Sequence, residues 1–179
     1  KLQNIDLLEY IKGIIQAVEP LALQRGLTLS FECKENSLFA NIDPDQFEKV
    51  ILNLLHNSIK FTPKDGQITV IVSESDTSIG IAVKDTGEGI PKNMLDKIFE
   101  RFSQVDGSMS RKWEGTGLGL ALVKEIVELH AGKVEVESTQ GKGSIFNIQI
   151  PKLAPNNPEQ SSSLQNLTQT SSLKVTEVL

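Results

Sequence analysis

The chain has 179 residues, of which 18 are basic and 23 are acidic, so the formal net charge is −5. With 39% hydrophobic and 23% charged residues, the composition is typical of a soluble globular protein and excludes collagen-like, coiled-coil and wholly disordered chains. No apolar run reaches the roughly 18 residues of a membrane helix, and no signal peptide is visible. The single cysteine, Cys33, cannot form an internal disulfide, which favours a reducing compartment. The chain begins at Lys1 rather than Met, so we expect a fragment of a longer protein.

The first third of the sequence predicts two amphipathic helices separated by two short strands. Apolar residues recur three and four apart over residues 8–22, with Asp6 as the N-cap and Gly26 just after the C-terminus. Pro20 lies inside this pattern, where proline kinks or splits a helix. Residues 27–33 and 37–42 predict strands. Asp43 and Pro44 then open a helix that ends near Phe61.

The rest of the ordered pattern consists of two hairpins and two helices. Residues 67–75 and 78–85 predict one hairpin, and residues 133–139 and 144–150 predict another. Residues 91–102 predict a short helix and residues 117–130 a strongly apolar one. Both hairpin links are too short for parallel crossovers. The expected fold is therefore α+β, a two-layer α/β sandwich whose mixed, mainly antiparallel sheet is covered on one face by helices.

The composition changes after Pro151. Ser, Thr, Asn and Gln make up 14 of the 28 residues from 152 to 179. Such a segment cannot bury enough apolar surface to offset its chain entropy. We expect one folded domain over residues 1–151, followed by a flexible tail or linker over residues 152–179.

The first candidate cluster lies on the second helix. Asn53 and Asn57 are four residues apart and so share one face, with Lys60 one turn further on. Amide oxygens are hard ligands suited to magnesium already carried by phosphates, and the lysine adds a cation. Buried hydrogen bonding within the helix explains the two asparagines about equally well.

The second cluster follows a predicted strand, where Asp85 is succeeded by Gly87 and Gly89. A carboxylate at a strand end can accept a hydrogen bond from an exocyclic amine such as that of adenine. Glycines permit close backbone approach there. Taken alone, a plain strand-to-helix turn is the favoured interpretation, since Asp and Gly are common turn residues.

Two further clusters are less specific. Gly115, Gly117 and Gly119 lead into an apolar helix, an arrangement that can bind phosphate although it matches neither a Walker P-loop nor a dinucleotide fingerprint. Tight helix packing is the competing explanation. Residues 98–102 contain two phenylalanines that predict core packing, and Arg101 adds positive charge beside the loop that follows. Taken alone, a solvated surface is the favoured explanation of that charge.

The order and spacing of the four clusters closely resemble the catalytic ATP-binding domain of two-component sensor histidine kinases, within the gyrase, heat-shock-chaperone and mismatch-repair ATPase group. Residues 53–61 resemble its N box, residues 85–89 its G1 box, residues 98–102 its F box and residues 115–119 its G2 box. The resemblance implies a Bergerat-type ATP-binding fold with ATP and Mg²⁺ as ligands. The residues it implies for catalysis are Asn53, Lys60 and Arg101; for magnesium, Asn57 and Asn53; for nucleotide, Asn57, Lys60, Phe61, Asp85, Gly87, Gly89, Ile90, Phe99, Gly115, Thr116, Gly117, Leu118, Gly119 and Leu120.

The same resemblance bears on the reaction. Hydrolysing members of the group carry a glutamate one helical turn before the magnesium asparagine, whereas this chain has Asn53, and an amide cannot act as a general base. Phosphotransfer to an external nucleophile is therefore expected. Neither His56 nor His130 has the flanking residues of the family's acceptor histidine. The expected partners are the chain's own dimerisation and phosphoacceptor helices, which are absent from this sequence, and a response regulator receiver domain; nucleic acid is not expected.

The family further implies a cytoplasmic location for the domain, in a parent protein expected to be a homodimer, and leaves membrane anchoring of that parent open. Two alternatives remain at this point. One is a serine kinase of the anti-sigma type, which shares the ATP-binding fold, and the other is a nucleotide-binding interaction module without catalysis.

Overall fold

The computed structural model describes residues 1–101 and 117–152. The elements in chain order are β1 (Gln3–Asp6), α1 (Leu7–Gln24), β2 (Thr28–Cys33), β3 (Phe39–Ile42), α2 (Pro44–Phe61), β4 (Gln67–Glu74), β5 (Ser78–Asp85), the 3₁₀ helix η1 (Lys92–Met94), α3 (Gly119–Leu129), β6 (Lys133–Thr139) and β7 (Gly143–Pro151). Within these residues no helix is both long enough and apolar enough to span a bilayer.

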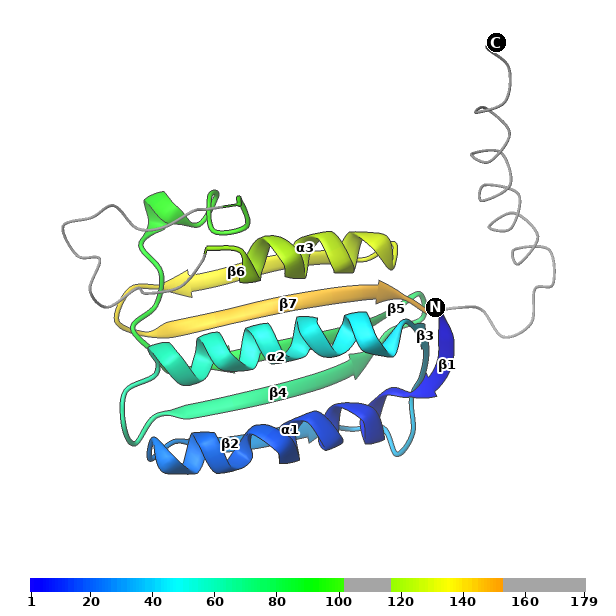
Figure 1. Cartoon of the computed structure of the whole chain (residues 1–179), viewed down its shortest axis with the longest axis horizontal. Helices are drawn as coiled ribbons and strands as arrows, with labels where there is room; N and C mark the ends of the chain where they lie inside the picture. The colour runs from blue at the N-terminus through cyan, green and yellow to red at the C-terminus, as the bar shows by residue number, and fades with distance from the viewer. Residues whose placement is uncertain (102–116, 153–179) are drawn as a thin grey trace, which may run out of the picture.

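The main sheet has five strands in the order β2-β4-β5-β7-β6. Only the pairing of β2 with β4 is parallel, and the other neighbours run antiparallel. The strands β1 and β3 form a separate antiparallel pair at one end. All three α-helices lie over one face of the sheet (Figure 1). The predicted two-layer sandwich with a mixed, mainly antiparallel sheet is therefore confirmed.

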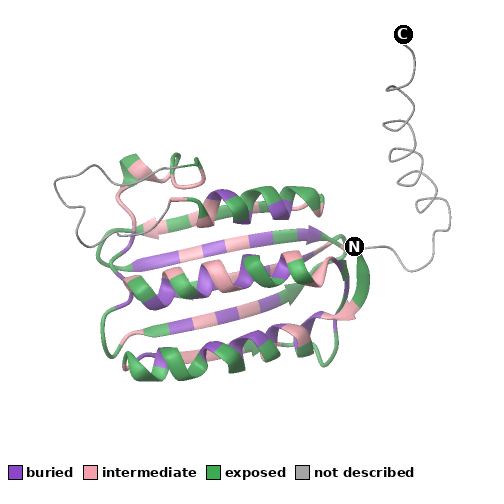
Figure 2. Cartoon of the chain, in the orientation of Figure 1, coloured by how far each residue is buried: buried purple, intermediate pink, exposed green. Residues whose placement is uncertain are grey.

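The core lies between the helices and the sheet, because each element turns one apolar face toward the other layer. Strands β4 and β5 alternate buried and less buried residues (Figure 2), and Val70 pairs with Val83 in the sheet. Fully buried residues on α2 recur at helical spacing on its inner face; they include Phe47, Val50, Ile51, Leu54 and Leu55. Burying a side chain of this size contributes roughly 1.5–3 kcal/mol, so the α2 face is a major part of the core.

The structure confirms the predicted ends of α1. The Asp6 side chain accepts a hydrogen bond from the Leu8 N–H, and Gly26 adopts a φ of +71° just beyond α1. A split of the helix at Pro20 is wrong, because α1 runs without interruption to Gln24. Val18 and Ala22 are both buried on either side of the proline, and that packing offsets the single N–H that proline lacks.

Two segments differ from the sequence-based expectation. A helix was predicted over residues 91–102, but within the described residues 91–101 only the short η1 forms, followed by turns whose hydrogen bonds mostly span three residues. A segment this short is marginal as an isolated helix, and its Ile98 and Phe99 side chains pack against the core instead. Residues 3–6 form β1, which the sequence did not predict, because its partner β3 is more than thirty residues away.

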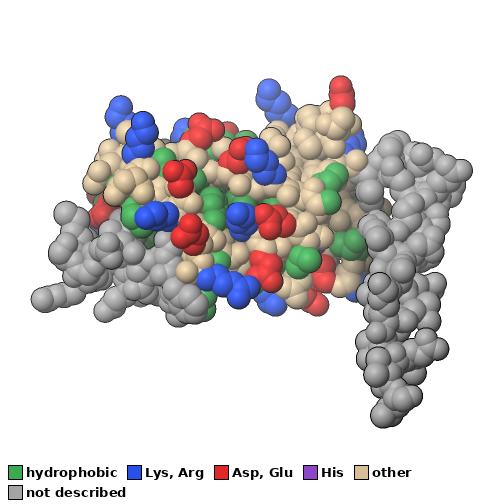
Figure 3. All heavy atoms as spheres, turned by 90° about the horizontal axis from the view of Figure 1, so that it is seen from above, with side chains coloured by type: hydrophobic (Ala, Val, Ile, Leu, Met, Phe, Trp, Pro, Cys, Tyr) green, Lys and Arg blue, Asp and Glu red, His purple; other side chains and the backbone are tan. Residues whose placement is uncertain are grey.

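Charge is evenly distributed on the surface that Figure 3 shows. Basic and acidic side chains are interspersed across that face of the molecule. Exposed ion pairs of the described residues include Lys124 with Glu128 at 3.9 Å and Lys133 with Glu135 at 2.6 Å. Exposed pairs of this kind contribute little to stability, typically about 0–1 kcal/mol each.

Candidate nucleotide-binding site

The helix α2 presents two amides on one face. The Asp43 side chain caps its first turn by accepting from the Gln46 N–H at 3.3 Å. Further along, Asn53 and Asn57 are both half-buried, and the Asn53 side-chain N–H donates to the Lys49 carbonyl at 2.7 Å. This bond orients the Asn53 amide and leaves its oxygen as the group turned away from the helix backbone.

Asp85, at the end of β5, is a buried carboxylate surrounded by donors. It accepts hydrogen bonds from the Gly87 N–H at 2.8 Å, the Ser144 N–H at 3.3 Å and the Ser58 hydroxyl at 3.3 Å. Burial raises the pKa of Asp85 above its ordinary value, and the three hydrogen bonds offset only part of that rise. A buried acidic group at a strand end is typical of a binding site rather than of a plain turn.

The segment after Asp85 is held against two other elements. The Glu88 N–H donates to the Phe61 carbonyl at 3.1 Å, and the Ile90 N–H donates to the Ser138 hydroxyl at 2.7 Å. A β-carbon on Gly87 would lie 2.7 Å from the Phe61 carbonyl oxygen. One on Gly89, where φ is +69°, would lie 2.1 Å from the Thr139 carbonyl oxygen. Both glycines are therefore required by close backbone approach.

Three serines around Asp85 were not among the site residues predicted from the sequence. Ser58 and Ser144 contact Asp85 directly, and the Ser138 hydroxyl lies 2.9 Å from that of Ser144. Ser58 did carry a signal, because it falls on the apolar face of α2 at helical spacing from Leu54 and Leu55. Ser144 and Ser138 carried none, because only the pairing of β6 with β7 brings them together.

The start of α3 meets the asparagine face of α2. Gly117 has a φ of +66°, and Leu118 is the N-cap residue, which offers no side-chain oxygen to the first turn. A β-carbon on Gly119 would lie 2.6 Å from the Asn53 amide oxygen. The structure therefore places the start of α3, at Gly119, beside Asn53. Gly115 and Thr116 lie outside the described residues.

The remaining predicted residues differ in how far they are buried, since Phe61 and Phe99 are half-buried and Lys60 and Arg101 are exposed. Phe99 packs edge-on against Phe146 with ring centroids 6.4 Å apart, which places the former on the core. The ammonium group of Lys60 lies 5.1 Å from the ring centroid of Phe61. Arg101 is exposed and donates to the Glu125 carboxylate on α3 at 3.0 Å. That contact ties Arg101 to α3, and its role toward phosphate stays a prediction.

Three comparisons place the chain among known proteins. Residues 42–154 match the family model "Histidine kinase-, DNA gyrase B-, and HSP90-like ATPase". The chain is 41% identical over 160 residues to hybrid signal transduction histidine kinase D of Dictyostelium discoideum, covering 87% of this chain and 10% of that protein. It is 40% identical over 154 residues to sensor histidine kinase TmoS of Ectopseudomonas mendocina, covering 86% of this chain and 16% of that protein.

Among solved structures, the catalytic domain of histidine kinase ThkA superimposes with a TM-score of 0.76 at 27% identity, covering 85% of this chain and 98% of that one. The chain thus spans a small part of the curated relatives but nearly the whole of an isolated catalytic domain. The fold agrees with these matches. The chain belongs to the histidine kinase-, DNA gyrase B- and HSP90-like ATPase family, as a catalytic ATP-binding domain of the histidine kinase type.

Proposed function

We propose that this domain binds magnesium-bound ATP and donates its γ-phosphoryl group to a histidine on a dimerisation and phosphoacceptor domain, in two-component signalling. The observation that carries the proposal is Asp85, buried at the end of β5 and held by Gly87, Ser144 and Ser58. A carboxylate fixed in this way can accept a hydrogen bond from the adenine amine and so selects the base. Family membership supports ATP as the ligand.

The residues present suit magnesium as well as the nucleotide. Asn57 and Asn53 offer neutral oxygen ligands, which suit a metal ion that already carries phosphate oxygens. The close approach of Gly119 to Asn53 brings the backbone N–H groups at the start of α3 beside the Asn53 amide. Such N–H groups favour phosphate oxygens, and Lys60 adds a positive charge on α2. Bound magnesium would neutralise phosphate charge during transfer.

The domain's own part in the reaction is mainly positioning. Phosphoryl transfer depends on alignment and charge neutralisation rather than on covalent chemistry by the protein. Asp85 would hold the base at one end, and Asn57 with the start of α3 would hold the phosphates at the other. Because Asn53 is an amide, it cannot take a proton from water, which favours transfer to histidine over hydrolysis.

The partners follow from the same proposal. ThkA has been solved in complex with the response regulator protein TrrA, and that ThkA chain matches here at a TM-score of 0.69 and 25% identity. By analogy, we expect a receiver domain to take the phosphoryl group from the acceptor histidine. The parent protein would act as a homodimer through its phosphoacceptor helices, with this domain in the cytoplasm.

The test has two stages. Calorimetric titration with a non-hydrolysable ATP analogue, with and without magnesium, should show magnesium-dependent binding that Asp85→Asn loses. The chain is then mixed with a histidine kinase phosphoacceptor domain and γ-labelled ATP, and acid-labile label on that domain is expected. Acid-stable label would indicate a serine kinase instead. Binding without any transfer would indicate an interaction module, and a folded chain that binds no nucleotide would overturn the proposal.

A further inference from the structure

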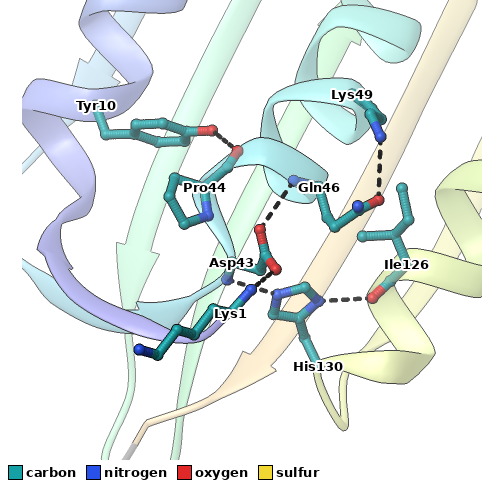
Figure 4. Close-up of polar contacts among 8 residues, drawn as sticks. All are labelled: Lys1, Tyr10, Asp43, Pro44, Gln46, Lys49, Ile126 and His130. Carbon is teal, nitrogen blue, oxygen red and sulfur yellow. Dashed lines mark hydrogen bonds and ion pairs between the residues drawn. The ribbon is translucent and has the colours of Figure 1, made fainter.

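His130, which follows α3, uses both of its ring nitrogens. Its Nδ1 lies 2.7 Å from the Ile126 carbonyl oxygen, and its Nε2 accepts a hydrogen bond from the Asp43 N–H at 2.9 Å (Figure 4). Because a carbonyl oxygen only accepts, Nδ1 carries the proton and Nε2 presents its lone pair. The imidazole ring therefore links the backbone of Ile126 to that of Asp43, which is 87 residues from His130 in the sequence.

This link joins the two helices that form the candidate site. Asp43 is the N-cap residue of α2, and His130 is the C-cap residue of α3. The imidazole also packs edge-on against Phe47, with ring centroids 5.4 Å apart, and Phe47 is fully buried. The ring is therefore held by packing as well as by its two hydrogen bonds. Through these contacts it connects the C-terminal end of α3 to the N-terminal end of α2.

A second close approach lies at the opposite end of α3, beside the middle of α2. Gly119, the first residue of α3, lies so near Asn53 that a β-carbon on it would be 2.6 Å from the amide oxygen. The two helices thus run antiparallel and meet closely at both ends of α3. With 11 residues, α3 is about 16 Å long, short enough for a shift at one end to be carried to the other. Any slide or tilt of its C-terminal end must also move Gly119 relative to Asn53.

We propose that His130 is a positioning residue for the nucleotide site. By bonding to the Asp43 N–H, it sets how far α3 lies along α2, and thereby sets the N–H groups at the start of α3 against the Asn53 amide. The proposal rests on the proposed function, since those groups are assigned there to phosphate and magnesium. It assigns His130 no contact with nucleotide.

The variants separate hydrogen bonding from packing. His130→Phe keeps an aromatic ring against Phe47 and removes both hydrogen bonds. His130→Gln keeps an acceptor oxygen at the reach of Nε2. Leu129→Ala changes the neighbouring, largely exposed side chain and serves as the matched control. All measurements are made well below the unfolding midpoint of the least stable variant.

The first readout needs no nucleotide. Amide hydrogen exchange is followed at Asp43, which reports on the bond itself, and at Leu122, whose N–H donates to the Leu118 carbonyl at 3.0 Å in the first turn of α3. His130→Phe should speed exchange about tenfold at both amides, and His130→Gln should restore most of the protection. Faster exchange at Asp43 with no change at Leu122 would overturn the proposal, because the far end of α3 would not respond.

The second readout is affinity for the ATP analogue with magnesium. His130→Phe should weaken binding about five- to tenfold, His130→Gln should recover most of it, and Leu129→Ala should match the unmodified chain. Unchanged affinity in His130→Phe would overturn the positioning role. If the unmodified chain itself binds no nucleotide, the proposed function fails, while the exchange at Leu122 still decides whether His130 sets the position of α3.

Discussion

The Ser58 hydroxyl on α2 donates a hydrogen bond to the Asp85 carboxylate at the end of β5, with 3.3 Å between the two oxygens. Both side chains are buried. This contact joins the helix that carries Asn57 to the strand end that carries the proposed adenine acceptor. The two motifs therefore lie close together because a contact within the core connects them, and not because a surface loop brings them together.

Replacing Asp85 with Asn should separate binding from stability. The Asn oxygen can keep the N–H donors of Gly87 and Ser144, and its amide N–H can donate to Ser58, so no buried group loses its partner. The adenine amine, however, would face a site whose remaining free group is a donor. We expect nucleotide affinity to fall about tenfold or more, measured by calorimetry, while the fold is retained.

The stability of Asp85→Asn follows from the sign of the pKa shift. Burial raises the pKa of Asp85 in the folded state, so the folded chain keeps this proton at pH values where the unfolded chain has lost it. The free energy of unfolding therefore falls as the pH rises above the ordinary value near 3.8 toward the folded value. Urea unfolding should find Asp85→Asn at least as stable as the unmodified chain at pH 7. A large loss of stability would contradict this account.

Removing the Asn57 side chain should affect the metal dependence of binding. Asn57→Ala deletes a proposed oxygen ligand, so the gain in nucleotide affinity on adding magnesium should shrink by about tenfold. His56→Ala is the matched control, because His56 is the adjacent residue on α2 and is exposed. Calorimetric titrations with and without magnesium compare the two. An equal effect of both substitutions would remove Asn57 from the metal site.

Alanine substitutions at two glycines separate the cost of a steric clash with neighbouring backbone from the cost of a positive φ. Gly89 and Gly141 have φ values of +69° and +80°, but a β-carbon on Gly89 would meet the Thr139 backbone, whereas one on Gly141 would meet nothing within 4 Å. Gly141→Ala should lower the free energy of unfolding by about 1–2 kcal/mol. Gly89→Ala should lower it by about 3 kcal/mol or more. Similar losses in urea unfolding would show that the turn moves freely away from Thr139.

Tyr10 should give the chain a measurable alkaline sensitivity. Its hydroxyl donates to the Pro44 carbonyl at 2.6 Å, and burial, followed by the nearby carboxylates of Glu48, Asp45 and Asp43, raises its pKa well above the ordinary value. The unfolded chain then loses this proton first, near pH 10, so the free energy of unfolding falls as the pH rises further. Tyr10→Phe should be about 1 kcal/mol less stable at pH 7 and should flatten the alkaline fall.

The measurement for Tyr10 is direct, because it is the only tyrosine in the chain. Absorbance of the phenolate reports its ionisation in the folded and unfolded states without interference from other tyrosines. Urea unfolding from pH 7 to 11 supplies the matching free energies. Ionisation of the folded chain near pH 10 would refute the raised pKa.

Much of the fold could be read from local patterns. The capping residues Asp6 and Asp43, the alternating strands and the two hairpins each act within a few residues, and the structure shows them where the patterns predicted. The helix expected over residues 91–102 was wrong for the complementary reason. Its apolar side chains pack against distant residues, as Phe99 does against Phe146, and that packing outweighs a local preference for helix.

The sequence by itself determined the family, the order of the motifs and the residue types that suit Mg-ATP, because these depend on spacing along the chain. Only the tertiary structure decided which partners hold Asp85, how closely Gly119 approaches Asn53 and that His130 bonds to the Asp43 N–H. Each of these contacts joins elements far apart in sequence. No local pattern encodes such pairs, because they exist only once the sheet and the helices have packed together.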